Sequence, residues 1–358
     1  MQVTKCVEKR WLMGKIVIMP FGKEGRKIYS ELGKNSQFEE IVVVDNYSKD
    51  PMVKRIHEVD NPRMYTWYIA TTRRDAYFAC RKQIVELGVD DDEIVDACDF
   101  EKKRFYKDNV IPRLGVLATS FCNLKCKHCA DLIPQRSNYH YDIEDIKKDL
   151  QSIFDSNIRI EKILLIGGEI LLYPDLDELL EFCISHDEYI GHIELTTNGT
   201  IMPNEKIWSL LVNPRVVLRV SGYSPKVAPK RQAIIEMAKS RKVKIEDLEG
   251  MKWFDIGGVQ NRGRTPEQMK AIFTACSMRE CVTLCKGGLI VYCSREEAAL
   301  ETDLLPTPTE EEYVNVRKYS GVGLQEELVK FYAREYITAC NFCDGLTPDS
   351  VEIPVAEQ

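Results

Sequence analysis

The segment "SFCNLKCKHCADL", residues 120–132, places three cysteines at the spacing C-x3-C-x2-C, namely Cys122, Cys126 and Cys129. It directly follows "LGVLAT", residues 114–119, an apolar run that predicts a buried strand. Cysteine thiolates hold iron–sulfur clusters, usually four to a [4Fe–4S] cluster, so three of them leave one iron open to another ligand. Structural zinc sites are instead closed by four ligands. The spacing therefore favours an iron–sulfur cluster with an open position, and zinc is the alternative metal.

The composition limits the classes of protein to consider. The chain has 358 residues, of which 44% are hydrophobic and 29% charged, and this profile is typical of a soluble globular protein. Its formal net charge of −7 argues against general binding of nucleic acid. No apolar run is long enough to cross a bilayer, and the first residues lack the apolar core of a signal peptide. We therefore expect a cytoplasmic protein without a nucleic-acid or membrane partner.

Thirteen cysteines are many for a cytoplasmic protein. Disulfides are rare in that compartment, so clustered thiols indicate metal ligands or reactive groups. Besides the triplet, the clustered cysteines are Cys276, Cys281, Cys285, Cys293, Cys340 and Cys343. The scattered ones, which we expect to be small buried apolar residues, are Cys6, Cys80, Cys98 and Cys183.

Three domains of the α/β class are predicted. Short apolar strands alternate with amphipathic helices over residues 1–107, which indicates a small parallel sheet. Residues 108–265 repeat strand, loop and helix about six times, the pattern of a partial (β/α)6 barrel of the TIM type. Residues 266–358 are rich in cysteine and less periodic, and we expect the tail from Gly345 onward to be loosely held. In such a barrel the chemistry belongs on loops at the carboxyl ends of the strands, where the cysteine triplet is expected.

The cysteine triplet resembles the motif of the radical SAM enzymes, C-x3-C-x-(aromatic)-C after the first barrel strand, with His128 as the ring residue. The resemblance implies that Cys122, Cys126 and Cys129 bind a [4Fe–4S] cluster and that S-adenosylmethionine (SAM) chelates its fourth iron. An electron then breaks SAM to give a 5′-deoxyadenosyl radical, which abstracts a hydrogen atom from the substrate. A flavodoxin or ferredoxin is the expected kind of electron donor.

Further residues of the predicted barrel resemble the SAM-contacting positions of the same family. They are Gly167, Gly168 and Glu169 after the second strand, Thr197 and Asn198 after the third, and Arg219 and Ser221 in the fourth. Glycines let the backbone approach a ligand, and a carboxylate suits the SAM ammonium group. Each motif alone is compatible with an ordinary turn, but their order on successive strands supports the resemblance.

The later cysteines resemble the ligands of an auxiliary-cluster extension called a twitch domain, the shorter relative of the SPASM domain. The implied ligands of one auxiliary [4Fe–4S] cluster are Cys281, Cys293, Cys340 and Cys343. The first ligand is a choice, because Cys276, Cys281 and Cys285 all precede Gly288, the glycine of the pattern. With Cys281 chosen, Cys276 and Cys285 are spare thiols that can return a hydrogen atom to a substrate radical. A zinc knuckle is the alternative.

The N-terminal region resembles the small Rossmann-like units attached to sugar-modifying enzymes. Gly22 and Gly25 match the last two glycines of G-x-G-x-x-G, and Asp45 follows twenty residues later. Pro20 replaces the first glycine, and proline fixes φ and removes an N–H group. Nucleotide binding and a structural or docking role are both open for this region.

These resemblances imply a radical SAM oxidoreductase or epimerase acting on a small molecule of the carbohydrate or aminocyclitol type. The alternatives are radical maturation of a ribosomally synthesised peptide and, outside enzymes, a zinc-stapled binding protein. Arg262 and Arg264 are candidates for contact with a substrate phosphate, although exposed arginines are common.

Overall fold

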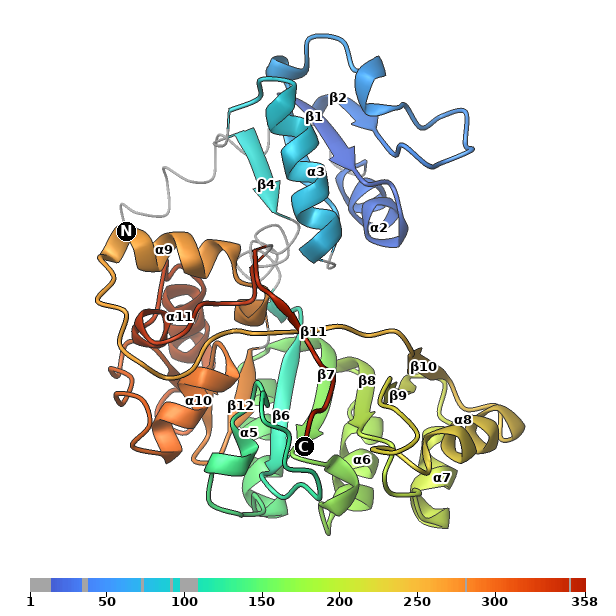
Figure 1. Ribbon diagram of the computed structural model, residues 1–358, viewed down its shortest axis with the longest axis vertical. Coiled ribbons are helices and arrows are strands. Elements are labelled where there is room, and N and C mark those ends of the chain that lie inside the picture. The colour runs from blue at the N-terminus through green and yellow to red at the C-terminus, as the bar shows by residue number, and fades with distance from the viewer. Residues whose placement is uncertain are drawn as a thin grey trace. The chain divides into compact units, whose positions relative to one another are not determined.

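The computed structural model describes residues 14–33, 38–71, 74–90, 93–96, 109–280, 282–347 and 349–358. The chain divides into two units, residues 1–103 and residues 104–358 (Figure 1). Cys6, Cys98 and Cys281 lie outside the described residues. Within the described ranges, no helix combines the length and the apolar character needed to cross a membrane.

The first unit is a parallel sheet with helices on both faces. Its elements are β1 (Gly14–Met19), α2 (Lys23–Leu32), β2 (Phe38–Val43), η1 (Ile56–Glu58), η2 (Pro62–Met64), β3 (Thr66–Ile69), α3 (Arg74–Glu86) and β4 (Ile94–Asp96), with strand order β2-β1-β3-β4. Alternate residues of a strand point to opposite faces. Ile16 therefore packs in one cluster with Ile28 of α2, and Val17 in another with Cys80 and Ile84 of α3. The predicted small parallel sheet is confirmed.

The glycine motif of the first unit has a packing role. A Cβ atom on Gly25 would lie 2.5 Å from the Pro20 carbonyl oxygen, so only glycine lets α2 begin this close to the end of β1. Asp45 accepts the N–H of Tyr47 at 2.9 Å in the turn after β2. Packing accounts for Gly25 and turn formation accounts for Asp45. Nucleotide binding by this unit remains a prediction.

The second unit is built on a sheet whose central strands are parallel. The strands of the whole sheet, in order across it, are β10 (Ile245–Leu248), β9 (Val216–Ser221), β8 (Ile190–Thr197), β7 (Arg159–Gly167), β6 (Leu114–Thr119), β12 (Thr283–Cys285), β13 (Leu289–Val291) and β14 (Val314–Asn315). Strand β5 (Val110–Ile111) also pairs with β7. From β10 to β12 every neighbouring pair is parallel, and β13 and β14 continue the sheet in antiparallel pairs. The predicted α/β class with a parallel, barrel-type sheet is confirmed.

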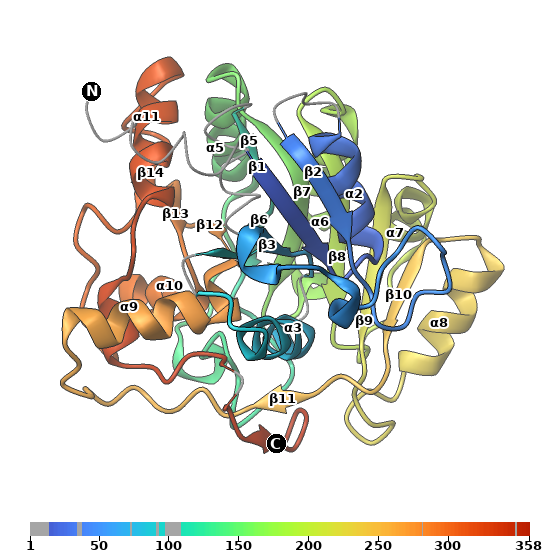
Figure 2. The same ribbon diagram turned by 90° about the horizontal axis from the view of Figure 1, so that it is seen from above.

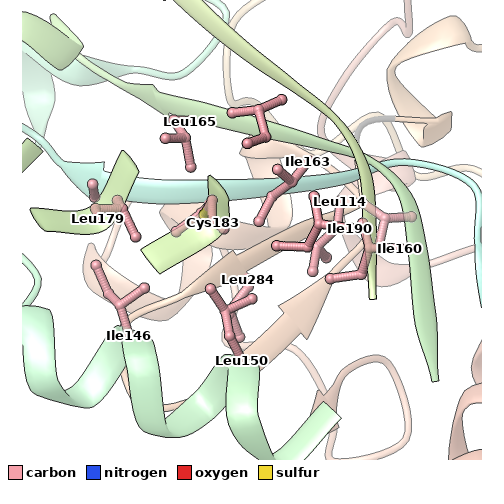
Figure 3. Close-up of a cluster of buried hydrophobic side chains, with 14 of the residues drawn as sticks. Leu114, Ile146, Leu150, Ile160, Ile163, Leu165, Leu179, Cys183, Ile190 and Leu284 are labelled. Carbon is pink, nitrogen blue, oxygen red and sulfur yellow. The ribbon is translucent and has the colours of Figure 1, made fainter. Parts of the chain in front are cut away.

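Helices pack against the parallel strands of this sheet (Figures 1 and 2). They are α5 (Ile143–Asp155), α6 (Leu176–Ser185), α7 (Glu205–Leu211) and α8 (Arg231–Ser240), with the short turns η4 (Ile133–Gln135) and η5 (Ile170–Leu172) in the intervening loops. Figure 3 shows Ile146 and Leu150 of α5 beside Leu284 of β12 and Cys183 of α6 in one apolar cluster. Cys183 is fully buried there, as expected for a scattered cysteine.

The cysteine-rich segment shares the apolar core of the barrel. Its helices are α9 (Pro266–Ala275), η6 (Ser277–Glu280), α10 (Ser294–Glu301), α11 (Gly321–Tyr332) and η7 (Thr338–Asn341). Phe273, Tyr292 and Phe331 of this segment belong to the same cluster as Leu114 of β6. The second unit therefore has one continuous core from the barrel into the segment.

A charge pair between Asp149 and the partly exposed Arg317 joins α5 to the turn after β14, and Tyr141 links this pair to the hairpin of β12 and β13. The fully buried carboxylate of Asp149 accepts hydrogen bonds from Arg317 at 2.6 and 2.9 Å, and also one from the Tyr141 hydroxyl. Gly288, at φ +74°, donates its N–H to the Tyr141 oxygen at 3.1 Å. A Cβ atom on Gly288 would lie 2.9 Å from atoms of both Arg317 and Asp149, so this position requires glycine.

The tail of the chain is attached rather than loosely held. Strand β15 (Glu352–Ile353) pairs antiparallel with β11 (Trp253–Phe254), and the Asp255 N–H donates to the Val351 carbonyl at 2.8 Å. The expectation of a loose tail was wrong because its backbone hydrogen bonds find a partner strand about a hundred residues earlier in the chain.

Candidate active site

The three-cysteine loop begins where β6 ends, and the end of β7 packs directly against it. The Gly168 and Glu169 N–H groups donate to the Thr119 and Phe121 carbonyls, each at 2.8 Å. A Cβ atom on Gly168 would lie 2.5 Å from the Phe121 oxygen and 2.8 Å from the Cys122 Cβ. Gly168 of the predicted motif is therefore required because a side chain there would prevent the close approach of the chain after β7 to the cysteine loop.

A cavity of about 350 Å³ opens at this end of the sheet. It brings together a large part of the residues predicted from the sequence, namely Cys122, Cys126, His128, Cys129, Gly168 and Asn198. Its other walls were not predicted as site residues and include Tyr223, Trp253, Phe254, Met278 and Leu346. The adjacent aromatics "WF" after "MK" are the one sequence signal that could have indicated this wall.

The thiols of the triplet are poorly solvated. Burial raises the pKa of Cys122, and burial together with the nearby Asp131 carboxylate raises the pKa of Cys129 to about 12. The Cys122 sulfur accepts the Leu124 N–H at 3.4 Å and faces the Asn198 side-chain amide at 3.8 Å. Such thiols become thiolates when a positively charged centre replaces the proton, which suits metal ligation.

Glu169 is buried behind the cavity and holds two strand ends together. Its carboxylate accepts the Leu171 N–H at 3.1 Å, the Thr197 hydroxyl at 2.9 Å and the Asn198 N–H at 2.7 Å. Burial raises the pKa of Glu169 despite these donors. Glu169 and Thr197 do not line the cavity, so their contact with SAM remains a prediction, while their mutual contact positions Asn198.

The two residues predicted on the fourth barrel strand also stand away from the cavity lining. Arg219 forms an ion pair with Glu246 at 2.7 Å and lies 3.7 Å from Glu194, along the strands rather than at their ends. Ser221 is buried at the end of β9, and its carbonyl accepts the Arg231 Nε–H at 3.0 Å.

A second cavity, of about 30 Å³, is lined by four cysteines of the C-terminal segment, Cys276, Cys293, Cys340 and Cys343. Three of them are predicted auxiliary ligands, and Cys276 joins them where the sequence analysis favoured Cys281. Cys281 lies outside the described residues. Cys285 does not line either cavity; it is buried in β12, with its thiol donating to the Leu289 carbonyl at 3.2 Å.

The second cavity is buried, and its sulfurs receive backbone N–H groups. The Leu346 N–H donates to the Cys276 sulfur and the Gly345 N–H to the Cys343 sulfur, each at 3.3 Å. Burial raises the pKa of Cys276 and Cys293, and it raises the pKa of Cys340 to about 12. N–H donors directed at sulfur are the surroundings in which cluster thiolates are stabilised.

A buried arginine supplies positive charge at this second cavity. Arg295 lines it, is 5% exposed, and donates one hydrogen bond from Nη2 to the Gly257 carbonyl at 3.0 Å. Its Nε and Nη1 atoms have no hydrogen-bond partner within the described residues. A buried charge with unused donors is unfavourable unless an anion compensates it. The site therefore fits an anionic occupant such as a cluster held by four thiolates.

Two arginines clamp the loop that carries Cys340 and Cys343. Arg264 donates from Nη1 to the carbonyls of both cysteines, at 2.6 and 2.5 Å, and Arg262 donates to the Phe342 carbonyl at 2.8 Å. Both arginines pair with Asp344 at 2.8 Å, and the hydrogen bond from Arg262 lowers the pKa of that carboxyl. These residues, considered from the sequence as phosphate contacts, are thus engaged in holding the cysteine loop.

A thin wall separates the two cavities. Ile256 and Met278 line both of them. Leu346 lines the first cavity, and its N–H donates to the sulfur of Cys276, which lines the second. One layer of side chains therefore lies between the first cavity and the four-cysteine site.

The donor sets fit iron–sulfur clusters. No three His, Cys, Asp or Glu side chains within the described ranges already converge on a point where they would hold a single metal ion. Thiolates that hold a cluster bind different irons and need not converge on one point. Sulfur ligands in buried pockets with N–H donors suit such a cofactor.

Comparison with known proteins identifies the central part of the chain. The sequence model of the Radical SAM superfamily matches residues 116–248. The "Antilisterial bacteriocin subtilosin biosynthesis protein AlbA" of Bacillus subtilis is 32% identical over 89 residues, which are 25% of this chain and 19% of that protein. The GTP 3′,8-cyclase of Aquifex aeolicus is 35% identical over 99 residues, which are 25% of this chain and 28% of that protein. The matched region thus spans less than a third of these relatives.

The following two are among the solved structures similar to this chain, each at low identity. That of BtrN in complex with AdoMet and 2-DOIA is 15% identical and covers 65% of this chain and 93% of that chain, with a TM-score of 0.46. That of Streptococcus suis SuiB bound to S-adenosylmethionine is 19% identical and covers 47% of this chain and 38% of that chain, with a TM-score of 0.32. The family match confirms the resemblance seen in the cysteine triplet: residues 116–248 are a radical SAM domain, whose cofactors are a [4Fe–4S] cluster and SAM.

Proposed function

We propose that the chain is a radical SAM oxidoreductase that removes two hydrogen atoms from a small molecule of the carbohydrate or aminocyclitol type. Cys122, Cys126 and Cys129 would hold the first [4Fe–4S] cluster, and Gly168 and Asn198 would lie beside SAM. When bound, the cluster and SAM supply a 5′-deoxyadenosyl radical that abstracts a hydrogen atom. A reduced flavodoxin or ferredoxin is the proposed electron donor.

The observation that carries the proposal is the one-layer wall between the two cysteine-lined cavities, formed by Ile256 and Met278. We propose Cys276, Cys293, Cys340 and Cys343 as ligands of an auxiliary [4Fe–4S] cluster. A cluster ligated fully by protein has no open iron, and the chemistry it supplies is electron transfer. An electron acceptor this close to the first cavity supports net two-electron oxidation.

The balance of such an oxidation is simple for an alcohol. The bound cofactors would take up the carbon-bound hydrogen atom and the surplus electron, and a base of this chain would take the hydroxyl proton. Asp131 and His128 line the first cavity and are the titratable groups that can take the hydroxyl proton there. The product is a ketone.

Epimerisation is the competing outcome, and it needs a thiol that returns a hydrogen atom to the substrate. Cys285 was a candidate, but its thiol is buried in β12 and directed at the Leu289 carbonyl, away from the first cavity. Cys276, the other candidate, lines the second cavity with three further cysteines. These positions favour oxidation over epimerisation.

The first cavity, of about 350 Å³, would hold the proposed cluster and SAM together with the reacting part of the substrate. Tyr223 and Trp253 meet edge to face, with ring centroids 5.9 Å apart, and form a rigid apolar wall. Maturation of a ribosomal peptide is the second candidate, and the test below separates the two.

The test uses anaerobically reconstituted protein with a chemical reductant, SAM, and either a panel of sugars and aminocyclitols or precursor peptides, in deuterated water. We expect 5′-deoxyadenosine and a product two mass units lighter from one member of the small-molecule panel. A product of unchanged mass, apart from one solvent deuterium, would mean epimerisation. A colourless, zinc-containing protein that releases no 5′-deoxyadenosine would overturn the enzymatic proposal.

The substitution Cys126→Ala removes one proposed ligand of the first cluster. We expect release of 5′-deoxyadenosine to be abolished while iron bound at the second site is retained, because the two cysteine sets line different cavities. Cys183→Ala, which removes a buried thiol that lines neither cavity, is the matched control and should keep the activity. Unchanged SAM cleavage in Cys126→Ala would refute the ligand assignment.

A further inference from the structure

The last residues of the chain form a strap that reaches the three-cysteine loop. We call residues 349–358 the C-terminal strap. It is anchored at its start by the pairing of β15 with β11 and by an exposed ion pair between Glu352 and Lys252 at 2.7 Å. Because β11 carries Trp253 and Phe254 of the first cavity, the strap is attached to the wall of the proposed active site.

Beyond β15 the strap runs onto the cysteine loop itself. The Lys127 N–H donates to the Glu357 carbonyl at 2.8 Å, and the Lys127 ammonium group also pairs with the Glu357 carboxylate. Ala356 is fully buried, with a φ of +52°. Glu357 thus contacts Lys127 through both its backbone and its side chain, and the residue before it, Ala356, is buried.

The side-chain amide of Gln358 contacts the loop at one of the proposed cluster ligands. Its Oε1 accepts the Lys125 N–H at 2.8 Å, and its Nε2 donates to the Cys126 sulfur at 3.2 Å and to the Ala356 carbonyl at 2.8 Å. The Lys125 N–H is only a donor, and the Ala356 carbonyl is only an acceptor, so these partners fix which end of the amide faces the sulfur. The N–H donor is therefore held toward Cys126.

We propose that Gln358 is a positioning residue for the cluster of the radical SAM domain. This inference rests on the proposed function of the three-cysteine loop. A hydrogen bond to a ligating thiolate disperses negative charge, and the reduced cluster carries one more negative charge than the oxidised one. The bond therefore stabilises the reduced form more and raises the reduction potential. The amide also fixes the Cys126 side chain, which holds the cluster in one place relative to SAM.

The experiment measures the potential of the cluster that SAM contacts. Anaerobically reconstituted protein of residues 1–358 is titrated potentiometrically, and the part of the reduced-cluster EPR signal that changes on adding SAM is followed. Only a cluster with an open iron responds to SAM in this way, so an auxiliary cluster does not interfere. Iron content is measured in parallel.

Two substitutions at Gln358 separate the donor from the rest of the residue. Gln358→Glu keeps an acceptor for the Lys125 N–H but replaces the donor with a negative charge, and Gln358→Met removes the donor at similar length. We expect a shift of the midpoint to more negative potential in both, larger in Gln358→Glu, with unchanged iron content. Glu357→Gln, which weakens the ion pair with Lys127 and leaves Gln358 in place, is the control and should keep the wild-type midpoint.

The outcomes distinguish this inference from the proposed function. The role of the amide would be overturned if both Gln358 variants kept the wild-type midpoint potential, or if Glu357→Gln shifted that potential equally. In either case a SAM-responsive signal would still support the proposed function. A wild-type protein without any SAM-responsive signal would overturn both. If Gln358→Glu fails to fold, Gln358→Met decides, because it introduces no charge.

Discussion

Arg264 shows how one side chain can organise a cysteine loop. Its guanidinium group spans the carbonyls of Cys340 and Cys343 and the carboxylate of Asp344. A planar group with several N–H donors can make these bonds at once, whereas a lysine ammonium group is a single point of charge. The geometry of the C-x2-C loop therefore depends on arginine at this position.

We predict that Arg264→Lys loosens the second cysteine site. The free energy of unfolding should fall by about 1–3 kcal/mol, because carbonyls that now accept from Arg264 lose their donor. Reconstituted iron should fall toward the amount that the first cluster alone accounts for, as measured by iron analysis and urea unfolding. Arg241→Lys, at an exposed pair with Glu205, is the control and should change stability by less than about 0.5 kcal/mol. Full iron retention in Arg264→Lys would contradict the clamp.

Glu296 makes a pH-dependent contribution to stability. It is 1% exposed, its Oε2 accepts the Tyr292 N–H at 2.7 Å, and burial raises its pKa to about 8 from an ordinary value of 4.5. Between these pH values the folded protein keeps a proton that the unfolded chain has lost. Glu296 should therefore lower the free energy of unfolding as pH rises from about 5 to 8, and its own contribution to the slope is at most about 1.4 kcal/mol per pH unit.

The substitution Glu296→Gln mimics the protonated side chain and should flatten that slope. The measurement is urea unfolding of anaerobic protein at several pH values between 5 and 8. Glu310→Gln, at an exposed pair with Lys318, should keep the wild-type slope. Equal slopes in wild type and Glu296→Gln would contradict this account.

The elements differ in how well their sequence predicts them. Strands β6 to β9 follow from apolar runs such as "LGVLAT" and "KILLIG", because strands buried on both faces need continuous apolar residues. The pairing of β11 with β15 could not be predicted, since two short strands carry little pattern and their partners are about a hundred residues apart. The three-cysteine loop could be assigned from spacing, which is local. The choice among Cys276, Cys281 and Cys285 as a ligand could not be made from the sequence, because it depends on where η6 and β12 lie relative to the other cysteines.

At the scale of elements, Asp149 bonds to Arg317 and Tyr141 and so fastens α5 to the turn after β14 and to the hairpin of β12 and β13. We predict that Asp149→Ala lowers the free energy of unfolding by about 1–3 kcal/mol, because the buried Tyr141 hydroxyl loses its acceptor and the partly exposed Arg317 loses its ion-pair partner. Urea unfolding measures this change. Asp155→Ala, at the exposed end of the same helix, is the control and should have a small effect. A loss below about 1 kcal/mol for Asp149→Ala would contradict the fastening role.

At the scale of the whole molecule, one apolar core runs from the barrel into the cysteine-rich segment. Leu114, Leu150 and Ile163 of the barrel share it with Leu284 and Phe331 of the segment. Sequence periodicity indicated separate regions at 108–265 and 266–358, because composition changes there. It could not indicate that their apolar faces pack together, since that depends on long-range contacts.

We predict that residues 104–358 fold without the first unit and that residues 104–265 do not. Removing the segment would expose the face of the barrel core that Leu284 and Phe331 now cover. Thermal unfolding followed by near-UV circular dichroism should show a cooperative transition for 104–358 and none for 104–265. A cooperative transition in the shorter chain would show that the barrel has an independent core.

Ile256 and Met278 face both cavities, so a substitution at either position changes the surroundings of both sites at once. Trimming Met278 to admit a bulkier substrate would also thin the insulation around the four sulfurs and let water reach them. Under the proposed function, the same two side chains would therefore affect both the fit of the substrate and the potential of the auxiliary cluster.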